Sequence, residues 1–307
     1  MIGLCVYLNH CRKHPFSLFK RVFPLILIVG VSVLICLKGR IHPRSHSSKF
    51  MGLQIITDSY STYSSTLSNG TKLKWGRALK HRWKEIYGEE NCEDDLQKRK
   101  LLVTLLRTWN LIASHHNITY SLMYGSLLGV ERTADILPWD HDLDIMVSYD
   151  GILKLERIAN ICDPRGHFDI NDGLPHLVVL PNSEHNVFMD DRRRFDCAGK
   201  EVAKLVDACS IQEPLARLIA GSVFMDFYHY TEKEDNLISV PEGKTVTYAK
   251  RDVFPLKECF LMGVKSWCPK DPIRVLETWY GKGRLGSHKS CQSGEWVELI
   301  TMVKPKR

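Results

Sequence analysis

Acidic residues at alternate positions precede an apolar run in the middle of the chain. Asp140, Asp142 and Asp144 stand in the stretch PWDHDLDIMV, shortly after a Gly125-Ser126 pair. Residues two apart on a strand point to the same face of the sheet, so Asp142 and Asp144 are expected to project together. Neighbouring carboxylates repel each other unless a proton or a cation lies between them. The spacing therefore predicts a divalent-metal site, with Mg²⁺ or Mn²⁺ as the ion.

The residues around this acidic stretch suit a phosphorylated substrate. The Gly125-Ser126 pair precedes an expected helical turn, where free backbone amides can bind a phosphate. Asp226, in VFMDFYHY, is a candidate third carboxylate, because its apolar neighbours make an unpaired charge unfavourable there. A metal ligand, a general base and a structural salt bridge are the three explanations for Asp226. Magnesium commonly binds one or two carboxylates together with substrate phosphates, and such sites promote phosphoryl transfer.

Hydrophobic periodicity predicts alternating helices and strands after residue 90. Asp271, Pro272 and Gly281 supply the N-cap, first helical position and C-cap of the last helix. The expected helices cover residues 94–115, 126–132, 150–161 and 271–281, and the expected strands 117–125, 142–149, 176–180 and 222–230. This order predicts an α+β domain with helices flanking one mixed sheet.

The N-terminus predicts membrane attachment. Residues 22–37 carry no charge and are flanked by basic residues, which is typical of a signal anchor, with a cleaved signal peptide as the alternative. The basic arm before residue 22 predicts a cytoplasmic tail over residues 1–21. Residues 38–90 include a Ser/Thr-rich stretch and read as a lumenal stem. Asn69 and Asn117 lie in N-glycosylation triplets, so residues 91–307 are expected to form a lumenal domain.

The charge balance argues against a nucleic-acid-binding protein. The net charge is +7, but residues 1–40 hold six of the 42 Lys and Arg and none of the 35 Asp and Glu. The remainder therefore carries 36 basic and 35 acidic side chains. A folded domain that binds nucleic acid usually shows a basic face, so no nucleic-acid partner is expected.

Seven cysteines follow the apolar segment, which predicts disulfides in an oxidising lumen. Their odd number leaves at least one free or paired between chains, so a homo-oligomer is one open alternative. No pair has the spacing of a cysteine-built zinc site.

The stretch MYGSLLGVERTADILPWDHDLDI resembles the signature of the LicD/fukutin-related family of phosphotransferases, which have a nucleotidyltransferase-like fold. The resemblance runs from about Leu122 to Gly281, where a Phe-Pro is followed by a short strand pair and a helix ending in Tyr-Gly. It implies transfer of ribitol phosphate or phosphocholine from a CDP-linked donor to a glycan or glycoprotein in the Golgi or endoplasmic reticulum. It also implies residue roles: metal binding and catalysis by Asp142, Asp144 and Asp226, and donor contacts by Gly125, Ser126, Arg132 and Asp140.

His141 departs from the family pattern, since many members have Asp at this position. Strand alternation predicts that His141 points away from Asp142, to the opposite face. Three arginines in DRRRF, residues 192–194, could clamp a diphosphate, although a solvated charged loop is the simpler interpretation. His176 and His185 are weaker candidates for a general base.

Two other functions fit parts of the pattern. An Asp-x-Asp glycosyltransferase that uses a nucleotide sugar explains the membrane topology equally well, but neither the Gly-Ser turn nor Asp226. A catalytically silent lumenal glycan-binding protein is the third hypothesis, and the retention of three carboxylates argues against it.

Overall fold

The computed structural model describes residues 95–162, 174–283, 285–286 and 289–299, together with 64–66, 72–74, 87 and 92. The expected tail and anchor, residues 1–37, lie outside the described residues, as do Asn69 and most of the expected stem. Within the described part of the chain, no helix combines the length and apolar character needed to cross a bilayer.

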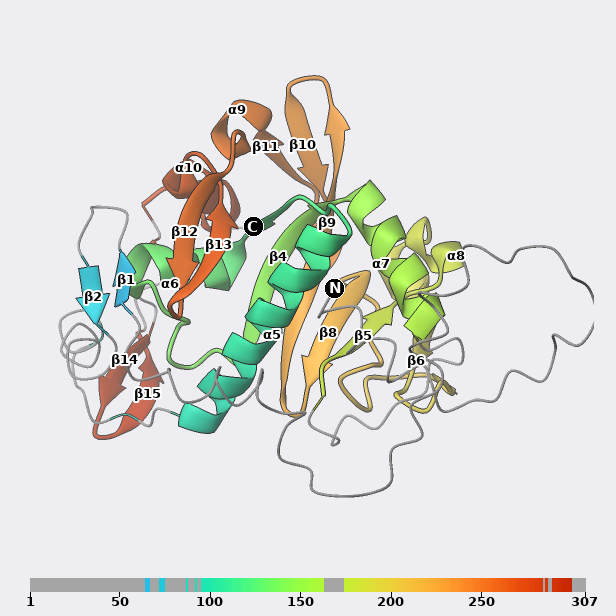
Figure 1. The fold of residues 1–307 in the computed structure, drawn as a ribbon, viewed down its shortest axis with the longest axis horizontal. Helices are drawn as coiled ribbons and strands as arrows, with labels where there is room; N and C mark the ends of the chain where they lie inside the picture. Colours follow the sequence, from blue (N-terminus) through green and yellow to red (C-terminus); the bar gives the residue numbers. More distant parts are fainter. Residues whose placement is uncertain are drawn as a thin grey trace, which may run out of the picture. The chain divides into compact units, whose positions relative to one another are not determined.

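A seven-stranded mixed sheet organises the described residues (Figure 1). Its central strand, β9, runs parallel to β4 and antiparallel to β8 and β10. The outer strands β3, β5 and β11 pair with β4, β8 and β10 respectively. The seven strands are β3 (Tyr120–Leu122), β4 (Asp142–Ser148), β5 (His176–Val179), β8 (Ala216–Ala220), β9 (Val223–Lys233), β10 (Asn236–Ser239) and β11 (Val246–Ala249).

The 11-residue length of β9 lets it join two parts of the sheet. One edge pairs with β4 over residues 224–230. The other edge pairs first with β8, over residues 223–227, and then with β10, over residues 230–233. A two-residue turn at Gly221-Ser222 connects β8 to β9, and Gly221 has a φ of 58°, which glycine adopts without steric cost.

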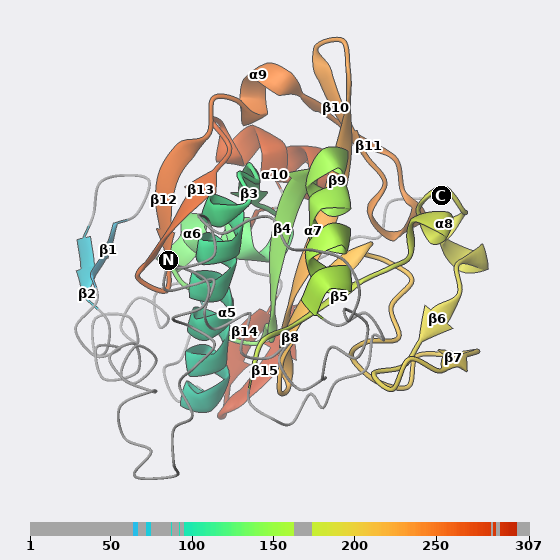
Figure 2. The same cartoon turned by 45° about the vertical axis from the view of Figure 1, so that its right-hand side comes forward.

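Two helices cover one face of the sheet (Figures 1 and 2). The helix α5 (Leu96–His115) begins at Asp95, whose side chain accepts a hydrogen bond from the Lys98 backbone N–H at 2.9 Å. Its buried Trp109 ring packs against Phe227 of β9, with the ring centroids 4.6 Å apart. The helix α7 (Tyr149–Cys162) follows β4 directly and packs on β5, β9 and β4.

The helices α6 (Tyr124–Thr133) and α10 (Pro272–Tyr280) pack against each other on the opposite face. The α6 helix fills the connection between β3 and β4, and α10 begins at Asp271, which accepts from the Arg274 backbone N–H at 3.1 Å. A β-hairpin of β12 (Lys257–Leu261) and β13 (Val264–Cys268) precedes α10. The strand pair and terminal helix expected after Phe254-Pro255 are therefore confirmed.

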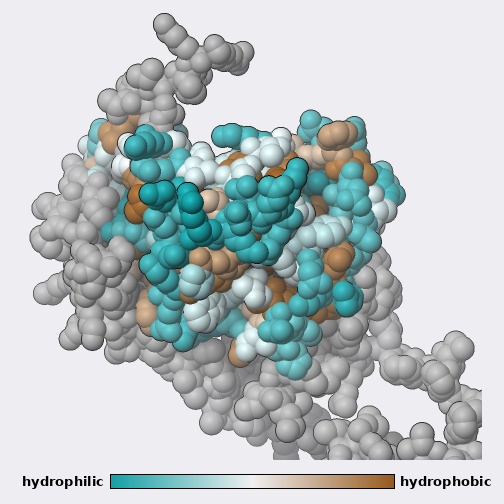
Figure 3. All heavy atoms as spheres, turned by 90° about the horizontal axis from the view of Figure 1, so that it is seen from above, coloured by the Kyte–Doolittle hydropathy of each residue, from teal (hydrophilic) through white to brown (hydrophobic). Residues whose placement is uncertain are grey.

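Shorter elements complete the described chain. They are β1 (Ser64–Thr66), β2 (Lys72–Lys74), α8 (Asn182–His185), η3 (Met189–Asp191), β6 (Arg194–Phe195), β7 (Glu201–Val202), η4 (Pro241–Gly243), α9 (Lys250–Val253), β14 (Lys289–Gln292) and β15 (Glu295–Glu298). Figure 3 looks onto the end that carries β10, β11, α9 and α10, where hydrophilic side chains predominate and less polar ones form separate small areas. Isolated apolar residues of this kind are normal on a protein surface and indicate no partner.

Six cysteines form three disulfides, as the sequence predicted for an oxidising compartment. Cys92 and Cys291 join segments 199 residues apart, whereas Cys197–Cys209 and Cys259–Cys268 close short loops. The seventh, Cys162, is the last residue of α7.

A buried ion pair fixes α5 against the loop that follows α6. Arg99 and Asp135 form a salt bridge, and their side chains are 2% and 0% exposed. The Asp135 carboxylate also accepts from the Ile136 backbone N–H at 2.8 Å. Gly129 is required nearby, since a Cβ there would lie 2.2 Å from the Asp135 carbonyl oxygen. This loop leads directly to the acidic stretch, so the pair helps to place it.

The structure confirms a mixed sheet flanked by helices and places the elements expected at the site. The expected strand over residues 117–125 is shorter than predicted, since α6 begins at Tyr124. The strands β8, β10 and β11 were not predicted. Both β8 and β10 pair with β9, and β11 pairs with β10, so they extend the sheet on the side of β9 away from β4.

Candidate active site

The parallel pairing of β4 and β9 places three carboxylates on one face of the sheet. Asp144 is the register partner of Asp226, so the two side chains project from neighbouring strands to the same side. Asp142 lies two residues before Asp144 and shares this face. The alternation within β4 brings Asp142 and Asp144 to one face, and the adjacent position of β9 adds Asp226, so the acidic surface spans two neighbouring strands.

Asp140 joins this group from the loop before β4. A Cβ built on Gly125 would lie 2.9 Å from Asp140 Oδ2 and 3.2 Å from Asp144 Oδ2. Both carboxylates therefore approach the same point at the start of α6, and a larger residue than glycine would displace them. We define Asp140, Asp142, Asp144 and Asp226 as the carboxylate cluster.

The start of α6 orients Asp144. The Gly125 backbone N–H donates to Asp144 Oδ2 at 3.0 Å, and the Asp144 backbone N–H donates to the Ser126 hydroxyl at 2.8 Å. Tyr124, just before Gly125, has a left-handed φ of 43° that turns the chain from β3 into the helix. The Gly-Ser pair was expected to contact a phosphate, but in the structure it holds a carboxylate.

Burial and mutual repulsion raise the pKa values of the carboxylate cluster. Burial first, and then the charge of Asp142, raise the pKa of Asp140 to about 7. The pKa of Asp144 is raised well above its ordinary value by burial and by the three other carboxylates. Burial also raises the pKa of Asp226 to about 6, although Arg217 opposes this shift. The cluster therefore carries more negative charge than its surroundings neutralise.

Asp226 forms a bidentate salt bridge with Arg217 of β8. Arg217 Nε donates to Asp226 Oδ1 at 2.6 Å, and Nη2 donates to Oδ2 at 2.9 Å. The two side chains are 11% and 6% exposed. The salt bridge, one of the three explanations open for Asp226, is thus present. It does not remove Asp226 from the site, because the carboxylate still stands in register with Asp144.

Arg132 lies at the end of α6, beside Asp140. Its guanidinium donates to the carbonyls of Leu285, at 2.9 Å, and Gly286, at 2.6 Å. Its charge, together with those of Lys98 and Lys289, lowers the pKa of Asp140 in opposition to burial. Arg132 is 9% exposed. Its hydrogen bonds hold residues 285–286 beside the site.

The position of His141 contradicts the strand-alternation argument. The His141 ring meets the Phe224 ring edge-on, with the centroids 5.5 Å apart, and Phe224 is the register partner of Asp142. The His141 charge also lowers the pKa of Asp226. His141 therefore lies on the side of the carboxylate cluster. The reason is that β4 begins only at Asp142, so the alternation of the strand does not extend to His141.

Aromatic side chains border the carboxylate cluster. The Tyr124 ring contacts Tyr228 of β9 and Trp279 of α10, each with ring centroids 4.9 Å apart. Burial raises the pKa of Tyr228, and the charges of Asp144 and Asp226 raise it further. The Tyr228 hydroxyl therefore lies beside the carboxylate cluster. Lys244 Nζ lies 5.1 Å from the centroid of the Trp279 ring. We call Tyr124, Tyr228 and Trp279 the aromatic wall.

The arginines of DRRRF form hydrogen bonds within the protein, and the Arg193 side chain is half exposed. Arg192 donates to Glu213 Oε2 at 2.5 Å and to two carbonyls, and Arg193 donates to Glu184 Oε1 at 2.7 Å. Arg194 donates to the Ser210 carbonyl at 2.8 Å. These contacts hold the segment between β5 and β8 together.

The two candidate histidine bases are also buried structural residues. His176 begins β5, and its register partner is Ile219 of β8. The His185 Nε2 atom lies 2.7 Å from the Leu180 carbonyl oxygen.

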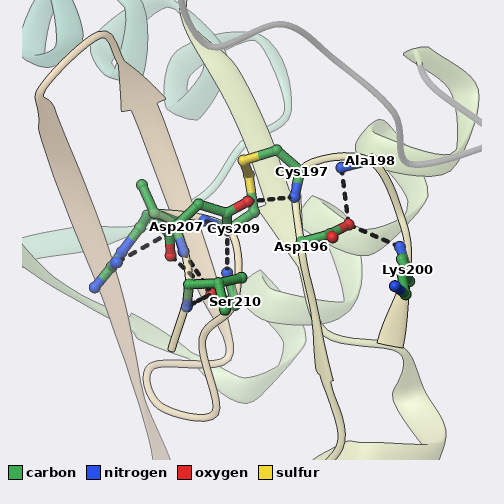
Figure 4. Close-up of a disulfide and its surroundings, with 10 residues drawn as sticks. Asp196, Cys197, Ala198, Lys200, Asp207, Cys209 and Ser210 are labelled. Carbon is green, nitrogen blue, oxygen red and sulfur yellow. Dashed lines mark hydrogen bonds between the residues drawn. A yellow bond between two sulfur atoms is a disulfide. The ribbon is translucent and has the colours of Figure 1, made fainter. Parts of the chain in front are cut away.

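A second group of metal-ligating residue types involves none of the four carboxylates of the cluster. Among the described residues, Cys197, Asp207 and Cys209 are the one such trio whose ligand atoms all lie within 4.8 Å of one another. The two sulfurs form a disulfide, and the Asp207 carboxylate accepts backbone N–H groups from Cys197, Cys209 and Ser210 at 2.9–3.0 Å (Figure 4). These atoms are already engaged, so the trio stabilises a loop.

Sequence reasoning missed Arg217 and Tyr228. Arg217 stands in the apolar run ARLIAG, where a single arginine gives no indication of its partner. A signal was nevertheless present, because counting outward from the Gly221-Ser222 turn brings Arg217 opposite Asp226. Tyr228 lies two residues after Asp226 on β9, so strand periodicity could have placed it on the same face.

Comparison with known proteins gives one family match. Residues 117–176 match the LicD/FKTN/FKRP nucleotidyltransferase domain. The matched segment contains β3, α6, β4 and α7, and therefore the loop and strand that carry Asp140, Asp142 and Asp144. No curated protein matched the chain.

Proposed function

We propose that this chain, a member of the LicD/fukutin-related family, transfers a phosphorylated alcohol from a CDP-activated donor to a glycan acceptor in a metal-dependent reaction. The family match supports phosphotransferase-type activity in general. The observation that carries the finer proposal is the in-register pairing of Asp144 with Asp226 beside Asp142. This pairing gathers acidic oxygens where two strands and a helix start meet.

The carboxylate cluster fits a hard divalent cation. Its donor atoms are all oxygens, which suit Mg²⁺ or Mn²⁺ and disfavour softer metals. The raised pKa values of Asp140 and Asp144 indicate negative charge that a cation would stabilise. Asp142 and Asp144 would hold the metal, with Asp226 as the third carboxylate. When bound, the metal would neutralise charge on the transferred phosphate and the departing CMP.

The surrounding residues orient these groups. Gly125 holds the Asp144 carboxylate through one hydrogen bond, and Ser126 holds the Asp144 backbone through another. Asp226 has lone pairs in addition to the two that Arg217 uses, and one of them can accept the proton of the acceptor hydroxyl. The aromatic wall offers ring faces to the donor or acceptor, as is common in ligand sites.

The test is substitution of the strand carboxylates. Asp142→Asn and Asp144→Asn keep the side-chain shape and remove one ligand charge each. We expect the transfer rate to fall by about 10³-fold, because each change weakens the stabilisation of the charge that develops on the transferred phosphoryl group. The protein should remain folded, since neither side chain forms an ion pair with a basic residue in the described chain.

Asp150→Asn is the matched control. Its side chain is 63% exposed and, among the described residues, forms an ion pair with Lys154 one helical turn away, so transfer should be unchanged. CMP release from CDP-ribitol and from CDP-choline, with and without Mg²⁺ or Mn²⁺, is the measurement. Turnover near the wild-type rate in both site variants would show that the pair is structural. Transfer from a UDP-sugar would instead identify a glycosyltransferase.

We also propose that residues 22–37 anchor the protein in a Golgi or endoplasmic reticulum membrane, with the domain in the lumen. Three disulfides support an oxidising compartment, and the exposed Asn117 lies where a glycan could be attached. In secretory cells the full chain should stay in the membrane pellet at alkaline pH and change mobility after glycosidase treatment. Protease digestion of the domain in sealed microsomes would contradict the lumenal orientation.

A further inference from the structure

Arg217 lies at the edge of the acidic face, next to Asp226. It lies on β8 opposite Asp226, and Asp226 lies on β9 beside Asp144 of β4. The three side chains therefore form a row across three adjacent strands, with the guanidinium at one end. Arg217 is the member of this row whose role neither the motif nor the family match assigns.

The contacts of Arg217 leave its guanidinium little freedom. Nε and Nη2 donate to the two oxygens of Asp226, and Nη1 donates to the Ala208 carbonyl at 3.2 Å. The guanidinium carbon lies 3.8 Å from the centroid of the Phe224 ring, which supports the cation from one side. A planar fork held at three nitrogens and one face fixes the orientation of its carboxylate partner.

Without the guanidinium of Arg217, the orientation of the Asp226 carboxylate would depend on the charges of its neighbours. The carboxylate is 6% exposed and faces the charge of Asp144 in the adjacent strand. Repulsion between buried carboxylates favours rotation of one away from the other or its neutralisation. Arg217 counters rotation by pairing with both carboxylate oxygens, so Asp226 keeps one defined orientation.

The Ala208 carbonyl belongs to a loop closed by the Cys197–Cys209 disulfide. Asp207 stabilises this loop by accepting from the backbone N–H groups of Cys197 and Cys209, as Figure 4 shows. The loop therefore presents the carbonyl that receives the third N–H of Arg217. The disulfide-closed loop therefore contacts the guanidinium of Arg217, which in turn pairs with Asp226.

We propose that Arg217 is a positioning residue of the active site, which acts through Asp226 and is itself held by the disulfide-closed loop 197–209. The inference rests on the proposed phosphotransferase function for its catalytic readout. It assigns no contact between Arg217 and the substrate. Its effect is to keep the third carboxylate in the orientation that transfer requires.

A double-mutant cycle on the full-length protein tests this assignment. The variants are Arg217→Gln, Arg217→Lys, Asp226→Asn and the double variant Arg217→Gln/Asp226→Asn. Arg217→Lys keeps the charge but loses the fork, and it covers the case in which Arg217→Gln fails to fold. CMP release from a CDP-linked donor gives kcat and KM, and thermal unfolding gives Tm.

We expect kcat to fall by about 10²-fold in Arg217→Gln and by about tenfold in Arg217→Lys, with the KM for the donor within about threefold of wild type. These magnitudes correspond to a carboxylate displaced by up to about 1 Å. The double variant should be no slower than Asp226→Asn, because Arg217 has no separate role. Losses that multiply in the double variant would overturn the proposal. A lowered Tm with unchanged kcat in both Arg217→Gln and Arg217→Lys would show a purely structural salt bridge.

Mn²⁺ titration, read by tryptophan fluorescence, separates this inference from the proposed function. If the wild type releases no CMP from either donor but binds Mn²⁺, the donor assignment fails. In that case the Arg217 proposal still requires Arg217→Gln to weaken Mn²⁺ binding at least about tenfold and the double variant to match Asp226→Asn. Unchanged Mn²⁺ affinity in Arg217→Gln and Arg217→Lys would then overturn it.

The two short-range disulfides provide a matched pair for the loop. Cys197→Ser/Cys209→Ser opens a loop of sequence separation 12, and Cys259→Ser/Cys268→Ser opens the β12–β13 hairpin, of separation 9. At a temperature where both variants are folded, the first should lower kcat by about tenfold and the second should leave it unchanged. Equal kcat values in the two variants would contradict a role for loop 197–209 in holding Arg217.

Discussion

Gly125→Ala should separate the activity of this protein from its stability. Alanine is preferred to glycine inside a helix by about 1 kcal/mol, and Gly125 is the second residue of α6. Its φ does not lie in the left-handed region, so the backbone accepts a side chain. On helix propensity alone, the variant would be as stable as the wild type or slightly more so.

The added methyl group nevertheless enters the carboxylate cluster. It would lie 2.9 Å from Asp140 Oδ2 and 3.2 Å from Asp144 Oδ2, and the first separation is shorter than real Cβ contacts allow. The Asp140 carboxylate must move by several tenths of an ångström, and Asp144 must move with it or lose its bond to the Gly125 N–H. Catalytic groups need placement within about 0.5 Å, and a shift of about 1 Å can reduce a rate 10²-fold.

We therefore expect transfer by Gly125→Ala to fall by about 10- to 10²-fold, with Tm unchanged within about 2 °C and Mn²⁺ binding weakened. The assay is CMP release alongside thermal unfolding and Mn²⁺ titration. Gly286→Ala is the control, since a Cβ there meets nothing within 4 Å, and it should behave as wild type. Activity near the wild-type rate in Gly125→Ala would refute the close approach of Asp140 and Asp144 to the helix start. A large loss of Tm would show that the glycine serves the fold.

Two further predictions concern pH and the buried ion pair. Burial raises the pKa of Asp140 to about 7 and that of Asp226 to about 6, and raises that of Asp144, so these groups bind protons more tightly in the folded chain. The metal-free protein should therefore be most stable near pH 4, and its Tm should fall as the pH rises to about 7. Saturating Mn²⁺ should flatten this dependence of Tm on pH. A Tm of the metal-free protein that rises over this range would contradict the prediction. Asp135→Asn breaks the buried pair with Arg99 and should lower the free energy of unfolding by about 3–5 kcal/mol in urea titrations, whereas a change under 1 kcal/mol would show that the pair contributes little.

The sequence predicted the parts of the site that depend on local periodicity. Asp142 and Asp144 alternate within one strand, so their shared face follows from period two. Asp226 could be singled out because an acidic residue among Phe224, Phe227 and other apolar residues needs a partner. What it could not indicate was that β9 lies parallel to β4 with Asp226 level with Asp144, since that pairing is set by the whole sheet.

The contacts between the site residues could not be predicted from the sequence, because they depend on how the elements pack. The amide of Gly125 was expected to bind a phosphate, and in the fold the carboxylate of Asp144 occupies it. His141 was placed on the far face because strand alternation was extended to it, whereas β4 begins one residue later, at Asp142. Arg217 was missed because its partner became visible only through the register of the β8–β9 hairpin.

The central claim is that the carboxylate cluster supports metal-dependent transfer of an alcohol phosphate. The most direct measurement is CMP release by the full-length protein from CDP-ribitol and CDP-choline, with a glycan acceptor, before and after removal of divalent metal with a chelator. The account predicts release from at least one donor, its loss on chelation, its recovery with Mg²⁺ or Mn²⁺, and no recovery in Asp142→Asn. Release that persists in the chelated protein, or equal activity in Asp142→Asn, would contradict the account.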